Sequence, residues 1–279
     1  ATRELRRAQA AHRRQTRRFV EQGHAMILRR LSQSLKEQNW TAIWIEFVLL
    51  VAGVFLGIQV SNWNAARADD IRAQTYLVRI KGNLNYDLQA IERREVFWRQ
   101  VIDYGNSAIR YAETGELVDG SKGKTVLAFY QASQLWPWVT NDTTYQELSN
   151  GGELGLIKDG NFRESLTKYY AEGAGKDLDY ILSSQPEYRK IVRGLTPVAV
   201  SNHVWAKCWK LPNAYEQYLL DCESPISEAD AQKVLDAYLK HPELLSELRF
   251  WNSSQGIAVK LVVNNKEAVT DMLKRMERV

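Results

Sequence analysis

TAIWIEFVLLVAGVFLGIQVSNW, residues 41–63, is the stretch of sequence that decides how this chain folds. Its first twenty residues hold one acid, Glu46, and one amide, Gln59, among mostly apolar neighbours. At about 1.5 Å of rise per residue, twenty helical residues cover about 30 Å, the thickness of a bilayer's hydrocarbon core. The apolar residues lie on every side of such a helix, so a soluble domain would have to bury all of its faces. We therefore predict a transmembrane helix over residues 40–63.

Tryptophans stand at both ends of this helix, with Trp40 and Trp44 at its start and Trp63 at its end. Indole rings favour the boundary between lipid headgroups and hydrocarbon because they combine an apolar body with a polar edge. We expect these three side chains to lie at the two membrane interfaces and to contact membrane lipid.

Two features inside the span need an explanation. Gly53 and Gly57 form a small-xxx-small pair, which lets two membrane helices approach closely, although glycine is also common in membrane helices generally. Glu46 lies about two turns inside the span, where an ionised carboxylate is costly unless it is paired, protonated or near water. It either serves a proton relay or an inter-subunit contact, or reaches back to the headgroups or to Lys36 or Arg30.

Charge is distributed unevenly over the 279 residues. The net charge of +4 combines ten Lys/Arg and three Asp/Glu in residues 1–40 (+7) with 27 and 30 in residues 41–279 (−3). Basic segments beside a span tend to stay in the cytoplasm, whereas a long C-terminal domain can be translocated whole. We predict a cytoplasmic N-terminus, an uncleaved signal anchor and an exported domain.

Residues 1–39 are too rich in arginine to build a core and are expected to form a basic cytoplasmic helix or a partly disordered arm. Such an arm contacts anionic lipid headgroups, contacts nucleic acid, or acts only as a topology signal. Its position beside a membrane span favours lipid over nucleic acid.

From residue 64 the sequence becomes polar but keeps apolar residues at three- and four-residue steps, with no proline before Pro137. This spacing predicts an amphipathic helix that continues out of the span and ends near Gly115 or the Asp119-Gly120 turn. Its apolar residues are Leu77, Ile80, Leu84, Leu88, Ile91, Trp98, Val101, Ile102 and Ile109.

Further helices are predicted along the rest of the chain. They are one over residues 124–135, one started by capping boxes of Thr143 and Thr144 with Gln146 and Glu147, one after Asp159-Gly160, one capped by Ser227, and a final one after His241-Pro242. No segment shows the sustained alternation of a strand bounded by hairpin turns. The predicted fold class is all-α, with one N-terminal transmembrane helix continuing into a long helix, followed by an exported helical bundle within residues 64–279.

Cys208 and Cys222 are the only cysteines. An even number of cysteines in an exported domain permits one disulfide, and the alternative is two buried free thiols. Two cysteines with no histidine at ligand spacing cannot complete a tetrahedral metal site. We therefore predict no bound metal.

Three groups of residues resemble a family of uncharacterised bacterial single-span proteins. They are Met26 with Gln38-Asn39-Trp40, the membrane exit Gly57-Ile58-Gln59-Val60-Ser61-Asn62-Trp63-Asn64, and Thr144-Tyr145-Gln146-Glu147-Leu148 followed by Gly152 and Leu154. The likeness covers most of the chain from Met26, its Gln-x-x-Asn-Trp-Asn exit is a fairly specific motif, and residues 1–25 depart from the family's usual start. The resemblance implies an anchor in the bacterial inner membrane and a helical domain in the periplasm, and it carries over no activity or catalytic residues.

Residue types that carry chemistry are scattered along the chain. His12, His24, His203 and His241 do not stand next to a nucleophile or a second ligand in sequence. Metalloprotease, phosphate-loop and dinucleotide motifs do not occur. We predict a protein that is not an enzyme and that uses no cofactor.

Aromatic residues have the most potential for binding. Their rings either line a groove with exposed polar tips or fill gaps between helices. The candidate binding surface comprises Trp136, Trp138, Tyr145, Tyr169 and Tyr170.

These observations lead to three functional hypotheses. The first is a non-enzymatic, membrane-anchored interaction or scaffold protein that forms a homo-oligomer or an accessory subunit of an inner-membrane assembly. The second is a periplasmic helical bundle that senses a ligand and signals along the helix after residue 64. The third is an ion-coupled stator-type component that uses Glu46.

Overall fold

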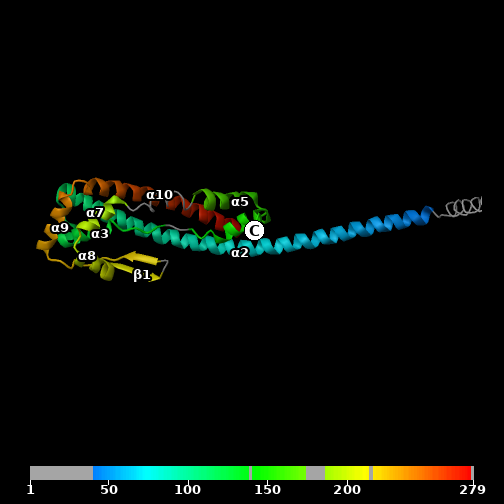
Figure 1. Cartoon of the computed structure of the whole chain (residues 1–279), viewed down its shortest axis with the longest axis horizontal. Coiled ribbons are helices and arrows are strands. Elements are labelled where there is room, and N and C mark those ends of the chain that lie inside the picture. The colour runs from blue at the N-terminus through cyan, green and yellow to red at the C-terminus, as the bar shows by residue number, and fades with distance from the viewer. Residues whose placement is uncertain (1–39, 138–139, 174–185, 214–215, 278–279) are drawn as a thin grey trace, which may run out of the picture. The chain divides into compact units, whose positions relative to one another are not determined.

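Helix α2 (Trp40–Thr114) is the longest element of the computed structural model, which describes residues 40–137, 140–173, 186–213 and 216–277 (Figure 1). Predictions for residues 1–39 and for Trp138 lie outside the described residues. As predicted, the helix continues past the apolar stretch and ends beside Gly115, whose φ is +78°. Glycine adopts this conformation without a Cβ clash, which is why it often closes helices. The chain divides into two compact units, Ala1–Ala68 and Asp69–Val279.

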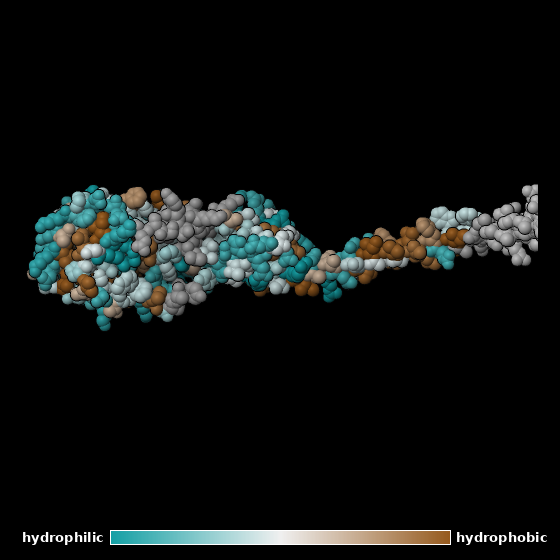
Figure 2. Space-filling model, viewed as in Figure 1, coloured by the Kyte–Doolittle hydropathy of each residue, from teal (hydrophilic) through white to brown (hydrophobic). Residues whose placement is uncertain are grey.

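The first part of α2 is apolar on all sides. Its most apolar window has a mean hydropathy of 2.2, and none of the side chains in that window is buried. Large apolar side chains lie fully in the open there, such as Leu49 and Leu50, which are 65% and 66% exposed (Figure 2). By length and composition this helix could span a membrane.

From Asp69 onward, α2 has one buried stripe and one polar face. Helix α10 (Leu244–Met276) runs beside it in the opposite direction, because Arg249 pairs with Glu113 (2.6 Å) while Lys266 pairs with Glu92 (3.3 Å). The helices approach closely at Gly105, where a Cβ atom would collide with the side chain of Asn252. The buried stripe of α2 includes Ala73, Ile80, Leu84, Ile91, Trp98, Val101 and Ala108.

Shorter helices surround this pair, and the all-α class is correct for the described residues. In chain order they are η1 (Val118–Gly120), α3 (Lys122–Gln131), α4 (Thr143–Asn150), η2 (Leu154–Leu156), α5 (Gly160–Thr167), the π-helix η3 (Lys168–Gly173), α7 (Glu187–Leu195), α8 (Val198–His203), the π-helix η4 (Val204–Cys208) and α9 (Glu228–Lys240).

Helix caps follow the sequence in two cases and depart from it in one. Ser227 accepts a hydrogen bond from the Asp230 N–H, as predicted. Asp159 caps α5 by accepting bonds from its first N–H groups, at the place where the sequence predicted only that a helix begins. The capping boxes predicted for Thr143 and Thr144 are wrong. Helix α4 begins after Asp142, and the Thr144 hydroxyl donates instead to Asn83 of α2 (3.0 Å). A long-range partner therefore replaces the local bond that the motif predicts.

One carboxylate joins the beginnings of two helices. Glu228 lies in the first turn of α9, and it accepts hydrogen bonds from the Lys122 N–H (2.9 Å), the Gly123 N–H (3.2 Å) and the Ser121 hydroxyl (2.8 Å) at the start of α3. These bonds lower the pKa of Glu228, and the bond from the Lys122 N–H has the largest effect. The carboxylate thus satisfies N–H groups that the first turn of α3 leaves without helical partners.

A small hairpin departs from the all-α prediction, and helices α7 and α8 were not predicted from the sequence either. Strand β1 (Trp209–Asn213) pairs antiparallel with β2 (Glu216–Leu219), and the register is irregular between Lys210 and Asn213. The strands have five and four residues, and β1 contains a proline. Such short strands give too little alternation to be detected in a sequence.

Candidate functional site

A cavity of about 510 Å³ opens where α2, α5 and the end of α10 meet. We call it the α2–α10 groove. Its volume lies within the roughly 300–1,000 Å³ that is usual for small-molecule sites. Its apolar lining comes from Ala73, Leu77, Val78, Ile157, Phe162 and Met276.

The two acids on the rim of the groove already have partners. Asp70 forms an ion pair with Lys158 at 2.5 Å. Asp159 accepts hydrogen bonds from the N–H groups of Asn161 (2.9 Å) and Phe162 (3.1 Å) at the start of α5. Lys81 and Arg275 also line the groove and are exposed. No described residue forms an ion pair with either of them. Asp70 and Lys158 balance each other, and Asp159 keeps its negative charge, so the lining of the groove has a net charge of +1.

Polar contacts hold one wall of the groove against α2. Arg72 pairs with Glu153 at 2.8 Å, and the Tyr76 hydroxyl donates to the same carboxylate at 2.8 Å. One turn on, Arg79 pairs with Glu147 at 2.5 Å, and this bond lowers the pKa of Glu147. The segment from α4 to η2 is therefore fixed to α2 at several points.

A buried carboxylate lies farther along α2. Asp87 is fully buried, and it accepts hydrogen bonds from the Asn141 N–H (2.8 Å) and the Tyr169 hydroxyl (3.1 Å). Burial raises the pKa of Asp87 from 3.8 to about 6. The Tyr170 hydroxyl interacts electrostatically with the same carboxylate but forms no direct hydrogen bond with it. Asp87 was not predicted from the sequence, although it falls between Leu84 and Ile91 at the spacing of the buried stripe.

Four of the five aromatic residues predicted as a binding surface, Trp136, Tyr145, Tyr169 and Tyr170, are described by the structure, and all four are buried. Tyr145 stacks on Tyr170 with ring centroids 5.4 Å apart, and Tyr169 meets Tyr170 edge-on at 4.7 Å. The Arg94 guanidinium lies 4.4 Å from the ring centroid of Trp136. These four rings are 4–9% exposed, so they fill gaps between elements, which was the second of the two interpretations.

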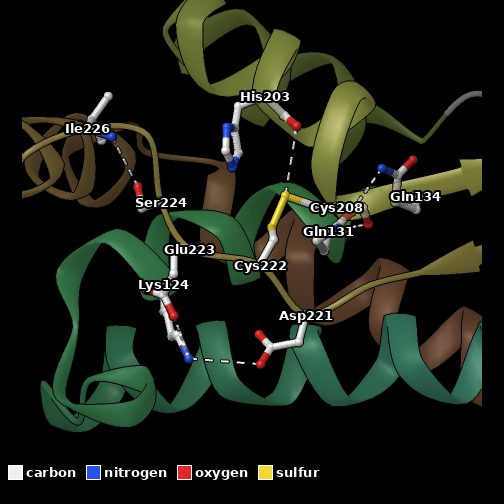
Figure 3. Close-up of a disulfide and its surroundings, with 10 residues drawn as sticks. All are labelled: Lys124, Gln131, Gln134, His203, Cys208, Asp221, Cys222, Glu223, Ser224 and Ile226. Carbon is white, nitrogen blue, oxygen red and sulfur yellow. Dashed lines mark hydrogen bonds and ion pairs between the residues drawn. A yellow bond between two sulfur atoms is a disulfide. The ribbon is translucent and has the colours of Figure 1, made fainter.

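Cys208 and Cys222 are joined in a disulfide, with Cα atoms 5.4 Å apart. The imidazole of His203 faces the sulfur atoms (Figure 3), and its ligand nitrogen and the two sulfurs lie within 4.8 Å of one another. His203 was not predicted to lie beside the cysteines. It ends α8, five residues before Cys208, and the turns of η4 bring the two residues together. While the sulfurs are bonded to each other they cannot act as thiolate ligands.

The predicted residues of the span are all open. Trp40, Trp44 and Trp63 are 70%, 62% and 62% exposed. A Cβ atom added at Gly53 or Gly57 would meet nothing within 4 Å. Glu46 is also exposed. The described residues therefore leave this helix surface available to lipid or to another helix.

Comparisons of the chain with protein-family models, with curated proteins and with solved structures find no match.

Proposed function

We propose that this chain is a membrane-anchored interaction protein of the bacterial inner membrane, with its N-terminus in the cytoplasm and its helical domain in the periplasm. One observation carries the proposal: an apolar helix surface of membrane length on which no side chain is buried. In water such a surface is unfavourable by about 25 cal/mol for each Å² of apolar area, so lipid or another helix has to cover it.

Charge and cysteine chemistry support the orientation. The first 40 residues have a net charge of +7, which favours their retention in the cytoplasm. The bond between Cys208 and Cys222 suits an oxidising compartment such as the periplasm. In this account the domain acts by binding other proteins and not by catalysis.

Gly53 and Gly57 give the interaction a specific face. They lie four residues apart on one side of α2, and neither is covered by any described residue. Small residues at this spacing let two helix backbones pack closely in lipid, where van der Waals contact drives association. We propose that a second copy of the chain packs on this face.

The test is the native mass of the full chain in mild detergent or nanodiscs. We expect a dimer or larger homo-oligomer that the double change Gly53→Ile with Gly57→Ile converts to monomer. Val51→Phe is the matched control, because it adds bulk on the opposite side of the same helix and should leave the mass unchanged. A wild-type chain that is strictly monomeric and copurifies with no partner would contradict the proposal.

A second candidate function, ligand sensing by the periplasmic domain, is favoured by the α2–α10 groove. The groove has the volume and apolar lining of a small-molecule site. A thermal-shift screen of the full chain against periplasmic metabolites and cell-wall fragments tests it. A stabilising compound whose effect is lost in a groove variant supports sensing, and the absence of any shift counts against it.

A further inference from the structure

The α2–α10 groove combines an apolar floor with unpaired positive charge at its rim. Leu77, Phe162 and Met276 come from three different elements and face one cavity. A ligand that buries apolar surface there would gain about 0.8 kcal/mol for each methylene group removed from water. The floor therefore favours a hydrocarbon tail.

The charge of the rim selects the other end of the ligand. Asp70 is occupied by Lys158, and Asp159 is occupied by the N–H groups at the start of α5. Lys81 of α2 and Arg275 of α10 have no ion-pair partner among the described residues, and both line the groove. A carboxylate or phosphate between them would form charge-assisted hydrogen bonds. The rim therefore favours an anionic headgroup.

The size of the groove limits the tail. Its volume of about 510 Å³ lies within the roughly 300–1,000 Å³ that is usual for sites that hold one small molecule. This volume suits a single acyl chain. From these observations we infer that the α2–α10 groove binds a long-chain fatty acid, with the carboxylate between Lys81 and Arg275 and the acyl chain over Leu77, Phe162 and Met276.

The source of such a ligand follows if the proposed membrane anchor holds. Asp70, the first lining residue of the groove, is seven residues after Trp63. Seven residues span at most about 25 Å even when fully extended, so the chain keeps the start of the groove near the membrane surface. Fatty acids partition into bilayers and would reach the groove from there.

Photocrosslinking of the full chain in phosphatidylcholine nanodiscs tests the inference. The probe is a palmitic acid with a diazirine near the end of its chain, and labelled peptides are mapped by mass spectrometry. Labelling of residues 43–60 reports the probe dissolved in the bilayer and serves as the internal standard. We expect additional labelling of residues 73–78, Phe162 or Met276, and an excess of unlabelled palmitate should remove it.

Variants test the two ends of the ligand separately. Lys81→Gln with Arg275→Gln should lower groove labelling, relative to span labelling, by about tenfold, because both charged partners of the carboxylate are removed. Lys260→Gln, another exposed lysine, is the control for this pair. Val78→Glu should also lower labelling, whereas Val96→Glu should not, since both valines are exposed on α2 but only Val78 lines the groove.

Two results would overturn the inference. One is equal labelling of the groove by the methyl ester of the probe, which lacks the negative charge. The other is labelling of the span by the fatty-acid probe with no labelling of the groove. The inference is equally wrong if a diazirine-bearing phosphatidylglycerol labels the groove and the fatty acid does not. Absence of label from residues 43–60 would instead show that the membrane anchor is wrong, so the two proposals fail by different readouts.

Discussion

The two parts of helix α2 differ in what covers their apolar side chains. Between Ile43 and Val60, apolar residues lie on all sides and remain exposed. From Asp69 to Thr114 most of them form one buried stripe, and Ile71, Val78 and Val96 are exposed outside it. Backbone hydrogen bonding is helical in both parts, so the backbone does not determine the environment. The arrangement of apolar residues around the helix does, because an all-round surface needs lipid and a stripe needs neighbouring helices.

The largest expected effect comes from placing charge in the exposed apolar part. Leu50→Arg with Val54→Arg should release the full chain from membranes, because each arginine at the centre of a span costs about 2.5–3.5 kcal/mol. The measurement is the fraction of protein left in the membrane pellet after an alkaline carbonate wash. Val96→Arg with Val198→Arg is the control, since these valines of the second unit are 58% and 72% exposed. Retention of the first variant in the pellet would mean that lipid does not cover this part of α2.

The same leucine-to-alanine change should have different effects in the two parts. Leu84 is fully buried, so Leu84→Ala should lower the free energy of unfolding of the domain by about 2–5 kcal/mol through lost burial and a cavity. Leu50→Ala, at a residue 66% exposed, should change it by less than about 0.5 kcal/mol. Urea unfolding followed by near-UV circular dichroism measures both. Equal losses would contradict the division of α2 into two environments.

Each part of α2 also holds an acid among apolar neighbours, and the buried one should make stability depend on pH. Burial raises the pKa of Asp87 from 3.8 to about 6, so the folded domain holds this proton more tightly than the unfolded chain. Its contribution to stability is fully present below about pH 4 and is lost as the pH rises through about 6. The loss amounts to about 3 kcal/mol, for a shift of about two pKa units.

Asp87→Asn removes this titration and tests it directly. Wild type should lose stability between pH 4 and pH 7 as Asp87 becomes ionised, and the variant should not. The variant should therefore become more stable relative to wild type at the higher pH. Leu84→Ala, which removes no titrating group, is the control and should lower the free energy of unfolding by a similar amount at every pH. A parallel shift of the Asp87→Asn profile at every pH would mean that only hydrogen bonding changed.

The smallest effect is expected on the polar face of the second part. Arg79 and Glu147 form an ion pair between α2 and α4, and their side chains are 41% and 45% exposed. Arg79→Met should therefore lower the free energy of unfolding by about 0.5 kcal/mol and by no more than about 1 kcal/mol. Arg99→Met, which breaks a pair with Glu95 within α2, is the control. A loss above about 2 kcal/mol at Arg79 would show that this contact holds α4 in place more strongly than exposed pairs do.

The helical part of the fold could be predicted because its signals are local. The apolar spacing of α2, the glycine after Thr114 and the cap at Ser227 each depend on residues within one or two turns. Features that depend on distant residues were not predictable in this way. The bond from Thr144 to Asn83 crosses 61 residues, and it replaces the capping box that the local motif indicates.

The candidate site was predicted less well than the fold. The groove is built by residues from α2, η2, α5 and α10 and from the loop between η2 and α5, and no short motif brings Leu77, Phe162 and Arg275 together. The aromatic residues were visible in the sequence, but whether a ring is buried depends on packing that the sequence does not reveal. His203 was missed for the same reason, since only the turns of α8 and η4 bring it beside the disulfide.

The carboxylate of Glu228 has a consequence for the order in which the domain forms. It is separated by 106 residues from Lys122, whose N–H it accepts, so the first turn of α3 lacks this partner until the chain has been delivered as far as α9. A domain translocated from its N-terminal end would hold α3 with a solvated, fraying start for about half of its export. That turn can close only once the start of α9 has arrived.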